Sequence, residues 1–471
     1  MTPEQIPNLI DGVDVPAASG AWLDKHRPAD GSVLCRIARS GFEDAAAAVA
    51  AARRAQPDWA ERTPVERGDL VRDIALALRD RREELSAVVA EAIGKPMALA
   101  LAETDAAIEM GFFVAGEGRR SYGRTMPASM PHRTVLTIRR PVGVAALLTS
   151  FNTPFPNVAW KAFPSILCGN ASVLKPSEHA PVSAHLFARI AHDVGLPAGV
   201  LNVLQGKGDE AGAALVAQSC DLVSFTGSAA VGRSIQREAG VAKLCLELGG
   251  KNALVVCDDA DLDDAVHWTI ASAFSNAGQR CAAGSRVVVF DAVYGQFRER
   301  LAAAVGVLDP ELVVSAESRD RILAAVAGAV ADGAAVVAGG RPGQGPGYEI
   351  APTVLENVVP AAEISCTELF GPVTILYRVP GLTEAIDLVN DTPYGLTAAI
   401  HTASLHRAMR FAEHAEVGVV VVNGGTHGSE PHMGFGGVKQ SGNGWKEAGM
   451  EAIEVYSDVR YVNLISDPAK T

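Results

Sequence analysis

One cysteine among small residues is the first candidate for chemistry in this 471-residue sequence. Cys281 follows the segment 278–280 (Gly-Gln-Arg) and precedes the segment 282–284 (Ala-Ala-Gly). A substrate can reach a thiol at such a break between a helix and a loop. The neighbouring Arg280 and backbone N–H groups would lower the pKa of this cysteine toward the reactive thiolate. Most isolated cysteines are instead small buried residues, so the local sequence leaves a nucleophile and a core residue both open.

Two polar side chains at the ends of strand-like segments are candidates for a base and an oxyanion donor. Glu247 lies in LELGGKN just before two glycines, where a carboxylate is either paired or has a raised pKa. A raised pKa suits a general base near neutrality, and the alternative is a structural carboxylate that binds the N–H groups of the glycine turn. Asn152, in TSFNTPFP, can donate to a developing oxyanion or be an ordinary turn residue.

Three further segments contain residue types that bind nucleotides. In VLKPSE, Glu178 can hold ribose hydroxyls, and Lys175 can reach the same hydroxyls or a phosphate; a surface ion pair is the commoner explanation of this spacing. In FTGSAAVG, a turn at Gly227 places Ser228 at a helix N-terminus, which is a site for a pyrophosphate or an ordinary helix cap.

The third of these segments is TELFGPV. Here Glu368 can accept hydrogen bonds from sugar hydroxyls, and Phe370 can flank a flat ring. The alternative is a turn with a core phenylalanine.

Alternating strands and helices must position these side chains. Segments 41–61 and 64–120 have the apolar spacing of helices, and 133–148 favours strands. From residue 142 onward short apolar strands alternate with helices; the strands are expected at 142–148, 171–175, 200–204, 222–225, 253–256, 287–290, 374–377 and 417–422, with a last one at 454–464. This alternation predicts parallel sheets covered on both faces, with ligands at the carboxyl ends of the strands.

Composition excludes several classes of function. With 41 Lys and Arg residues against 54 Asp and Glu, the net charge is −13, which disfavours a nucleic-acid partner. No apolar run approaches the roughly 20 residues that span a bilayer, and the N-terminal segment has no signal-peptide pattern. The seven cysteines are scattered without metal-ligand spacing. We therefore expect no membrane association, no metal site and a reducing, cytoplasmic location.

Taken in order, the motifs resemble the NAD(P)-dependent aldehyde dehydrogenase superfamily. The resemblance extends from about residue 8 to 465 and rests on FNTPFP, KPSE, FTGS, LELGGKN, GQRC, ELFGPV, NDTPYGL and GFGGVKQSGNG. This combination is highly specific. It implies an α/β fold with two parallel-sheet domains and a β-arm for oligomerisation: a cofactor-binding domain over 1–122 and 142–248, a catalytic domain over 249–435, and the arm over 123–141 and 452–466.

The resemblance also implies roles for the candidate residues. Cys281 would be the nucleophile, Asn152 and the N–H of Cys281 the oxyanion hole, and Glu247 the base that activates the hydrolytic water. Lys161 matches a family lysine near the cofactor. The implied cofactor-binding residues are Lys175, Glu178, Gly227, Ser228, Gly232, Leu248, Glu368 and Phe370. The expected substrate pocket contains Phe151, Phe155, Trp160 and Arg280, and the loop 424–435 closes over it. His427 and His432 in this loop are candidates for lining the entrance; the alternative is that they are surface histidines without such a role.

The implied reaction is oxidation of an aldehyde to a carboxylic acid through a thioester on Cys281. Glu178 would repel a 2′-phosphate, so NAD is expected, with NADP use left open by Lys175. Arg280 beside the nucleophile would favour a semialdehyde with a distal carboxylate, unless it points into the protein. The alternatives are a catalytically silent NAD-binding member and an acyl-CoA-forming enzyme. A homodimer or homotetramer is expected, because the arm alone would leave open sheet edges.

Overall fold

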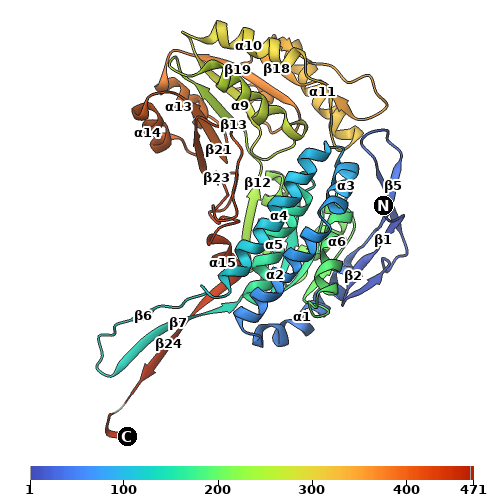
Figure 1. Cartoon of the computed structure of the whole chain (residues 1–471), viewed down its shortest axis with the longest axis vertical. Helices are drawn as coiled ribbons and strands as arrows, with labels where there is room; N and C mark the ends of the chain where they lie inside the picture. The colour runs from blue at the N-terminus through green and yellow to red at the C-terminus, as the bar shows by residue number, and fades with distance from the viewer. Residues whose placement is uncertain (1, 467, 471) are drawn as a thin grey trace.

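Two α/β bodies lie against each other in the computed structural model, and a narrow β-arm projects from one of them (Figure 1). The structure describes residues 2–466 and 468–470. The C-terminal strand forms part of the arm and ends at its tip. No helix among these described residues is long and apolar enough to cross a membrane.

The first body is built on a seven-stranded sheet whose order is β12-β11-β8-β9-β10-β2-β3. From β12 to β10 all neighbouring strands are parallel, while β2 and β3 add an antiparallel edge. The strands are β2 Asn8–Ile10, β3 Val13–Val15, β8 Val144–Leu148, β9 Ala171–Lys175, β10 Leu201–Val203, β11 Leu222–Gly227 and β12 Lys243–Leu248. Every residue of β8 and β9 is buried, which explains their continuous apolar sequence.

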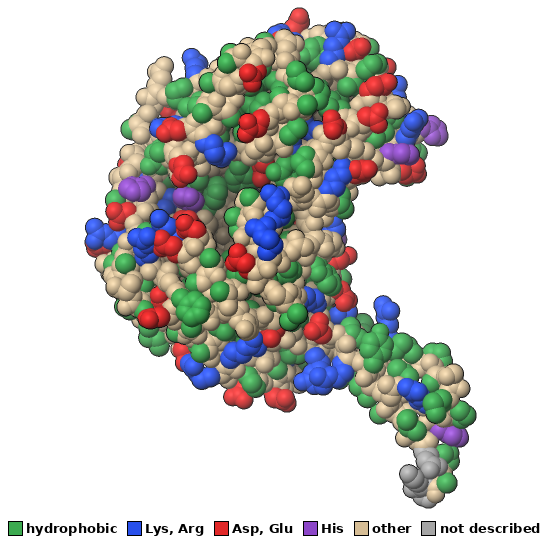
Figure 2. Space-filling model, turned by 180° about the vertical axis from the view of Figure 1, so that it is seen from behind, with side chains coloured by type: hydrophobic (Ala, Val, Ile, Leu, Met, Phe, Trp, Pro, Cys, Tyr) green, Lys and Arg blue, Asp and Glu red, His purple; other side chains and the backbone are tan. Residues whose placement is uncertain are grey.

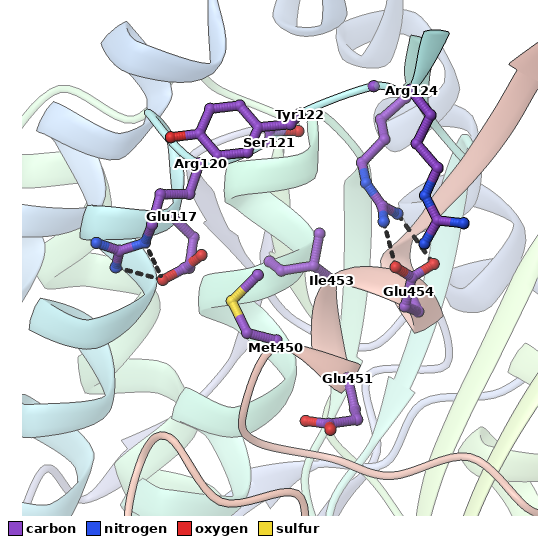
Figure 3. Close-up of a pocket in the computed structure, with 11 residues that line it drawn as sticks. Glu117, Arg120, Ser121, Tyr122, Arg124, Met450, Glu451, Ile453 and Glu454 are labelled. Atoms are coloured by element: carbon purple, nitrogen blue, oxygen red, sulfur yellow. Dashed lines mark hydrogen bonds and ion pairs between the residues drawn. The ribbon is translucent and has the colours of Figure 1, made fainter. Parts of the chain in front are cut away.

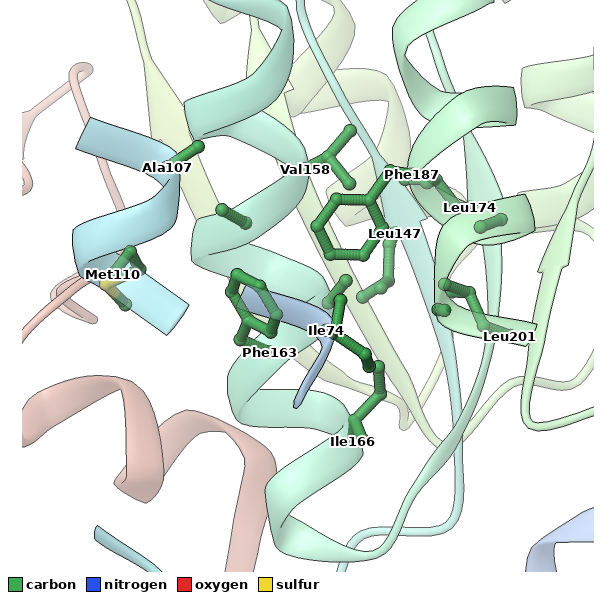
Figure 4. Packing of buried hydrophobic residues seen from close by; sticks show 14 of the residues in the cluster. Ile74, Ala107, Met110, Leu147, Val158, Phe163, Ile166, Leu174, Phe187 and Leu201 are labelled. Atoms are coloured by element: carbon green, nitrogen blue, oxygen red, sulfur yellow. The ribbon is translucent and has the colours of Figure 1, made fainter. Parts of the chain in front are cut away.

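Helices cover both faces of this sheet. They are α1 Phe42–Glu61, α2 Pro64–Asp80, α3 Arg82–Ile93, α4 Met97–Glu117, α5 Pro154–Cys168, α6 Pro181–Asp193, α7 Ala213–Val216 and α8 Ala229–Glu238. On one face α2, α4, α5 and α6 pack together, and the rings of Phe163 and Phe187 meet with centroids 5.1 Å apart (Figure 4). On the other face, residues of α1, α7 and α8 form a separate core cluster.

The second body repeats the plan with the strand order β16-β18-β19-β14-β13-β21-β22. All neighbours are parallel except β16 and β18. Its strands are β13 Asn252–Val256, β14 Gly284–Phe290, β16 Ala335–Ala338, β18 Thr353–Glu356, β19 Val373–Val379, β21 Thr397–His401 and β22 Val419–Val422. Its helices are α9 Leu262–Phe274, α10 Tyr294–Gly306, α11 Ala316–Ala331, α12 Glu363–Cys366, α13 Leu382–Asn390 and α14 Leu405–His414. The predicted α/β class with parallel sheets is therefore confirmed.

The arm consists of β6 Thr125–Met126, β7 Arg133–Pro141 and β24 Ser457–Ile465. β24 pairs antiparallel with β7 along its whole length, from Ser457 opposite Pro141 to Ile465 opposite Arg133. The strand expected from residue 454 begins at 457 instead. Residues 454–456 belong to the helix α15 Glu451–Tyr456, whose apolar side chains are buried beside α5. Burial of one helix face outweighed the short apolar alternation that had favoured a strand.

A small sheet near the N-terminus was not predicted. It has the order β1-β5-β4, with β1 Gln5–Ile6, β4 Trp22–His26 and β5 Val33–Ala38. The two seven-stranded sheets and the arm sheet support the division into two α/β domains and an arm, and the proposed domain boundaries remain a prediction.

Candidate active site

The turn that carries Cys281 links α9 to β14 and has an unusual backbone. After α9, a short 3-10 segment spans Ser275–Gly278, and Asn276 and Ala277 within it have φ of 59° and 54°. Such left-handed values are uncommon for residues with a Cβ and indicate a conformation imposed by surrounding contacts. Asn276 supplies one of these contacts, because its Nδ2 donates to the carbonyl oxygen of Asn152 at 3.1 Å. The nucleophile turn is thereby tied to the loop of the predicted oxyanion donor.

The environment of the Cys281 thiol differs from the one expected. Burial raises its pKa to about 12, and the carboxylates of Glu368 and Glu247 raise it further. Arg280 and the N–H of Ala282 act in the opposite direction, as the sequence had indicated, but they are outweighed. The thiol is therefore protonated at neutral pH in this structure, and its reaction as a nucleophile requires a nearby base.

Glu247 is a buried carboxylate at the end of β12. Neither of its oxygens has a hydrogen-bond partner among the described residues. Burial raises its pKa well above 4.5, and the carboxylate of Glu447 adds to this, while Lys161 and Lys446 oppose it. The alternative of a carboxylate bound to the glycine turn is not observed, since Gly250 N–H donates to Glu368 Oε1 at 3.2 Å instead. An unpaired carboxylate with a raised pKa is suited to accept a proton near neutral pH.

Asn152 is buried in the loop before α5, and its contacts orient its amide. Its Oδ1 accepts a hydrogen bond from Asn157 Nδ2 at 3.3 Å, and its backbone oxygen accepts from Lys95 Nζ at 2.8 Å. The Asn152 Nδ2 group donates to no atom of the described residues. This arrangement leaves the amide N–H groups available for a substrate oxygen, which supports the predicted role.

The predicted adenosine and pyrophosphate residues meet at one edge of the first sheet. Lys175 ends β9, and its Nζ lies 3.5 Å from the Glu178 carboxylate. Burial tends to raise the pKa of Glu178, but Lys175 and backbone N–H groups outweigh it and hold the pKa below its ordinary value. Ser228 is the N-cap of α8, where its hydroxyl accepts from Val231 N–H at 3.4 Å.

These residues fit a dinucleotide. Gly227 ends β11 opposite Leu248 of the neighbouring β12. A Cβ on Gly232 would approach the end of the Leu248 side chain at 2.5 Å, so a larger residue there would displace this side chain. The buried hydroxyl of Thr226, just before the turn, has no protein partner among the described residues. The ionised Glu178 can accept hydrogen bonds from ribose hydroxyls, and the N-terminus of α8 with the Thr226 hydroxyl can bind a pyrophosphate. These groups together match the chemistry of NAD or NADP.

Glu368 and Phe370 lie between α12 and β19 of the second body, and Glu368 contacts the glycine turn that follows β12. Burial raises the pKa of Glu368 to about 7. A Cβ on Gly249 would overlap this carboxylate, which explains the glycine there. The ring of Phe370 meets that of Phe151 edge-on at 5.5 Å, and Phe151 also contacts His179 at 5.6 Å. The structure therefore places Phe151 beside the predicted cofactor residue Phe370.

The remaining predicted pocket residues have different surroundings. Trp160 packs partly buried in a cluster with Cys281 and Phe435, and the Trp160 and Phe435 ring centroids lie 5.7 Å apart. Phe155, in the first turn of α5, is buried in the core and belongs to a different cluster. Arg280 lies next to Cys281 and is half-buried. The structure thus brings Trp160 and Arg280, but not Phe155, to the surroundings of the thiol.

A buried ion pair beside Glu247 was not predicted from the sequence. Lys161 Nζ pairs with Glu447 and donates to Ser224 Oγ at 2.9 Å, while Ser224 Oγ donates to Glu447 at 2.6 Å. The sequence had connected Lys161 with the cofactor. Its charge is instead matched by a carboxylate far along the chain, which no local motif indicates.

A cavity lies away from the candidate active-site residues. At the base of the arm, a cavity of about 360 Å³ is lined by α4, the segment 120–124, β7 and α15 (Figure 3). Arg120 pairs with Glu117 and Arg139 with Glu454 in its wall. None of the predicted catalytic or cofactor residues lines it. No cluster of metal-ligating side chains occurs within 2–466 and 468–470.

Comparison with known proteins gives consistent matches over nearly the whole chain. Residues 15–462 match the model of the aldehyde dehydrogenase family. The chain is 36% identical to a lactaldehyde dehydrogenase of Escherichia coli, covering 98% of this chain and 99% of that one. It is 35% identical to an NADP-dependent succinate-semialdehyde dehydrogenase of the same organism, covering 96% of both. A crystal structure of betaine aldehyde dehydrogenase from Staphylococcus aureus with NAD+ superimposes with a TM-score of 0.95 at 31% identity, covering 98% of this chain and 95% of that one.

Proposed function

Because the chain belongs to the aldehyde dehydrogenase family, we propose that Cys281, Asn152 and Glu247 carry out its oxidation of aldehydes. The enzyme is an NAD(P)-dependent oxidoreductase that converts an aldehyde to a carboxylic acid. The observation that supports the residue roles is the meeting of a thiol, an unpartnered buried carboxylate and an amide with free N–H groups around one turn.

The proposed steps follow from these groups. Glu247 accepts the thiol proton, and the Cys281 sulfur forms a bond to the aldehyde carbon. The carbonyl electrons move to oxygen, which accepts hydrogen bonds from Asn152 Nδ2 and the Cys281 N–H. The nicotinamide cofactor, when bound, supplies the acceptor for the hydride that leaves this carbon. Cys281 then holds the acyl group as a thioester.

Hydrolysis completes the reaction. Glu247 first releases the thiol proton to solvent; it then takes a proton from water, and the water oxygen bonds to the thioester carbon. The carbon–sulfur bond breaks, so that the acid leaves and the thiolate is restored. The presence of Glu247 supports hydrolysis over transfer of the acyl group to coenzyme A. The presence of all three groups argues against a catalytically silent protein.

NAD is the cofactor that the ribose site favours. Lys175, Glu178, Gly227, Ser228, Gly232, Leu248, Glu368 and Phe370 would hold it. The ionised Glu178 can accept from a free 2′-hydroxyl but repels a 2′-phosphate. Lys175 is the group that would permit some use of NADP, which the name of one relative specifies.

We also propose that the chain forms a homodimer or homotetramer through its arm. Hydrophobic side chains are exposed along the arm (Figure 2), among them Ile138, Val459, Tyr461, Leu464 and Ile465. A second copy would cover these side chains and the open strand edges of the arm. Light scattering after gel filtration measures the mass, and a monomer would contradict the proposal.

The seven free cysteines support a reducing, cytoplasmic location.

The first experiment compares wild type with Cys281→Ala. NADH formation is followed by absorbance with a panel of aldehydes, with and without coenzyme A. Cys35→Ala, a matched change of a buried cysteine in β5, is the control. We expect activity in wild type and the control, none in Cys281→Ala, and no dependence on coenzyme A. Persistent turnover in Cys281→Ala would contradict the proposed nucleophile.

A further inference from the structure

The guanidinium of Arg280, the residue before the nucleophile, lacks a partner. None of its nitrogens has a hydrogen bond or ion pair among the described residues, and its Nε is shielded from solvent. A guanidinium carries several N–H donors in a planar fork and is always charged in proteins. Such a group is rarely left in a protein interior without an acceptor. The guanidinium of this half-buried residue is therefore free to donate to a group from outside the chain.

The nearby carboxylates do not pair with Arg280. Glu103 is paired with Lys95 at 2.5 Å and accepts from Phe155 N–H at 3.3 Å. Glu311 accepts from Ala277 N–H at 2.6 Å. Both lie near enough to influence Arg280 electrostatically, yet neither is within ion-pair distance of it. The positive charge of Lys95 is matched by Glu103, and the donors of Arg280 remain unused.

A loop of the second body faces this arginine with further unused polar atoms. Thr426 fixes the loop, because its hydroxyl donates to Ala282 O at 2.6 Å and its N–H donates to Ser272 Oγ at 3.0 Å. The next residue, His427, has a buried Nδ1 without a partner, and so has the Ser429 hydroxyl. Burial, with the charge of Arg280 added, lowers the pKa of His427 to about 4, so the ring is neutral at physiological pH and lies close to the guanidinium.

Apolar side chains pack beside the thiol. Trp160 and Phe435 form a cluster with Cys281, with Ala282 and Leu396 beside them. A short methylene chain can pack against these side chains, whereas a charged group gains nothing there. Apolar contacts at the thiol and unused donors on Arg280, His427 and Ser429 together suit a ligand that has an apolar part and a polar end.

We propose that Arg280, with His427 and Ser429, binds a carboxylate at the far end of the aldehyde, so that the substrates are short-chain semialdehydes with a terminal carboxylate. This inference rests on the proposed dehydrogenase function. The two oxygens of a carboxylate match the two parallel N–H groups of a guanidinium. The neutral His427 ring and the Ser429 hydroxyl can each donate one further hydrogen bond.

The test compares 4-oxobutanoate with 4-methylpentanal, which replaces the carboxylate by an apolar group of similar shape. In wild type we expect kcat/KM to favour 4-oxobutanoate by roughly 100-fold. Arg280→Met should lower the ratio of kcat/KM for 4-oxobutanoate over 4-methylpentanal by roughly 100-fold, mainly through KM for 4-oxobutanoate. Because Arg280 also lowers the pKa of Cys281, a loss in kcat shared by both substrates reports on the thiol. Arg410→Met, the same change at an exposed position of α14, is the matched control and should alter neither substrate.

Two other variants keep the proposal testable if Arg280→Met does not fold. His427→Leu and Ser429→Ala should each raise KM for 4-oxobutanoate, by roughly tenfold, without raising KM for 4-methylpentanal. If Arg280→Met loses the same activity with both substrates, the carboxylate site is overturned. If the rate at which iodoacetamide alkylates Cys281 falls by the same factor, Arg280 acts on the thiol instead. Equal wild-type activity on both aldehydes would overturn the carboxylate site while leaving the dehydrogenase function in place. If the enzyme oxidises neither these two probes nor any simple aldehyde, the dehydrogenase function itself is contradicted.

Discussion

The side-chain amide of Asn252 donates a hydrogen bond of 2.7 Å to the carbonyl oxygen of Cys281. The same Nδ2 group donates to Ala283 O at 3.0 Å, and Oδ1 accepts from Thr397 N–H at 3.0 Å. Asn252 is the first residue of β13, so one buried amide joins the nucleophile turn to two strands of the second sheet. The backbone of the proposed oxyanion hole is thus positioned by the sheet rather than by the turn alone.

Asn252→Ala is expected to destabilise the protein and slow the reaction. The change leaves the Cys281 carbonyl oxygen and the Thr397 N–H without partners, whereas Ala283 O still accepts from Ser285 N–H at 2.9 Å. Buried unsatisfied groups cost about 1–3 kcal/mol each. We expect a loss of roughly 2–3 kcal/mol in the free energy of unfolding and a fall of at least about tenfold in kcat. Urea unfolding and steady-state kinetics measure both. Asn390→Ala, a bridging asparagine far from the site at α13, is the control and should leave kcat unchanged.

Glu247 should determine the acid limb of the pH–rate profile. Burial raises its pKa well above 4.5, and the proposed base must be ionised, so turnover should fall as pH drops through this raised value. Glu247→Gln should lower steady-state turnover by roughly 1000-fold. The first burst of NADH should also be slowed, because Glu247 accepts the thiol proton before hydride transfer as well as the proton of water afterwards. Stopped-flow absorbance separates the two phases, and an unchanged steady-state rate would remove Glu247 from the mechanism.

Ionisation of Glu247, which the proposed reaction requires, should lower the stability of the folded protein. A pKa raised in the folded state means that the folded protein binds this proton more tightly than the unfolded chain does. The associated stability is present at low pH and is lost as pH rises through the folded-state pKa. Glu247→Gln, which cannot ionise, should therefore have a higher Tm than wild type at alkaline pH. Scanning calorimetry across pH measures this difference.

Glu178 should set the preference between NAD and NADP. Its carboxylate is ionised beside Lys175, so it repels a 2′-phosphate. Glu178→Gln keeps a hydrogen-bond acceptor while removing the charge, and we expect the ratio of kcat/KM for NADP over NAD to rise by roughly 10- to 100-fold. Glu210→Gln, a change of an exposed carboxylate paired with Arg39, is the matched control. A ratio that moves equally in both variants would show that general surface charge, and not Glu178, discriminates the cofactors.

Much of this architecture could be predicted because buried parallel strands have a simple sequence. β8, β9 and β13 are fully buried on both faces and appear as short apolar runs, and the candidate side chains follow at their carboxyl ends. The edge and terminal strands were missed, since the pairs β1–β5 and β4–β5 are only partly buried and lack such runs. Local alternation also could not distinguish the buried helix α15 from a strand.

The site could be predicted where a motif contains its own chemistry. Cys281, Glu247 and Asn152 lie in short segments whose residue types indicate their roles. The partners that tune them come from far along the chain: Glu447 faces Lys161 across 286 positions, and no spacing within a motif indicates this. The arginine neighbour of Cys281 predicted a low pKa for the thiol. This prediction was wrong because burial and two distant carboxylates, which only the folded chain reveals, raise that pKa.

Glu368 should make NAD binding depend on pH near neutrality. Burial raises its pKa to about 7, and only the ionised form can accept hydrogen bonds from both ribose hydroxyls. The Kd for NADH, followed by its fluorescence, should therefore decrease between about pH 6 and pH 8. Lys251 is buried nearby and its pKa is lowered to about 7 by burial and by Arg286, so it titrates in the same range but loses charge as pH rises. Glu368→Gln should weaken binding by roughly tenfold and abolish the pH dependence, whereas a dependence that persists in this variant would assign it to Lys251.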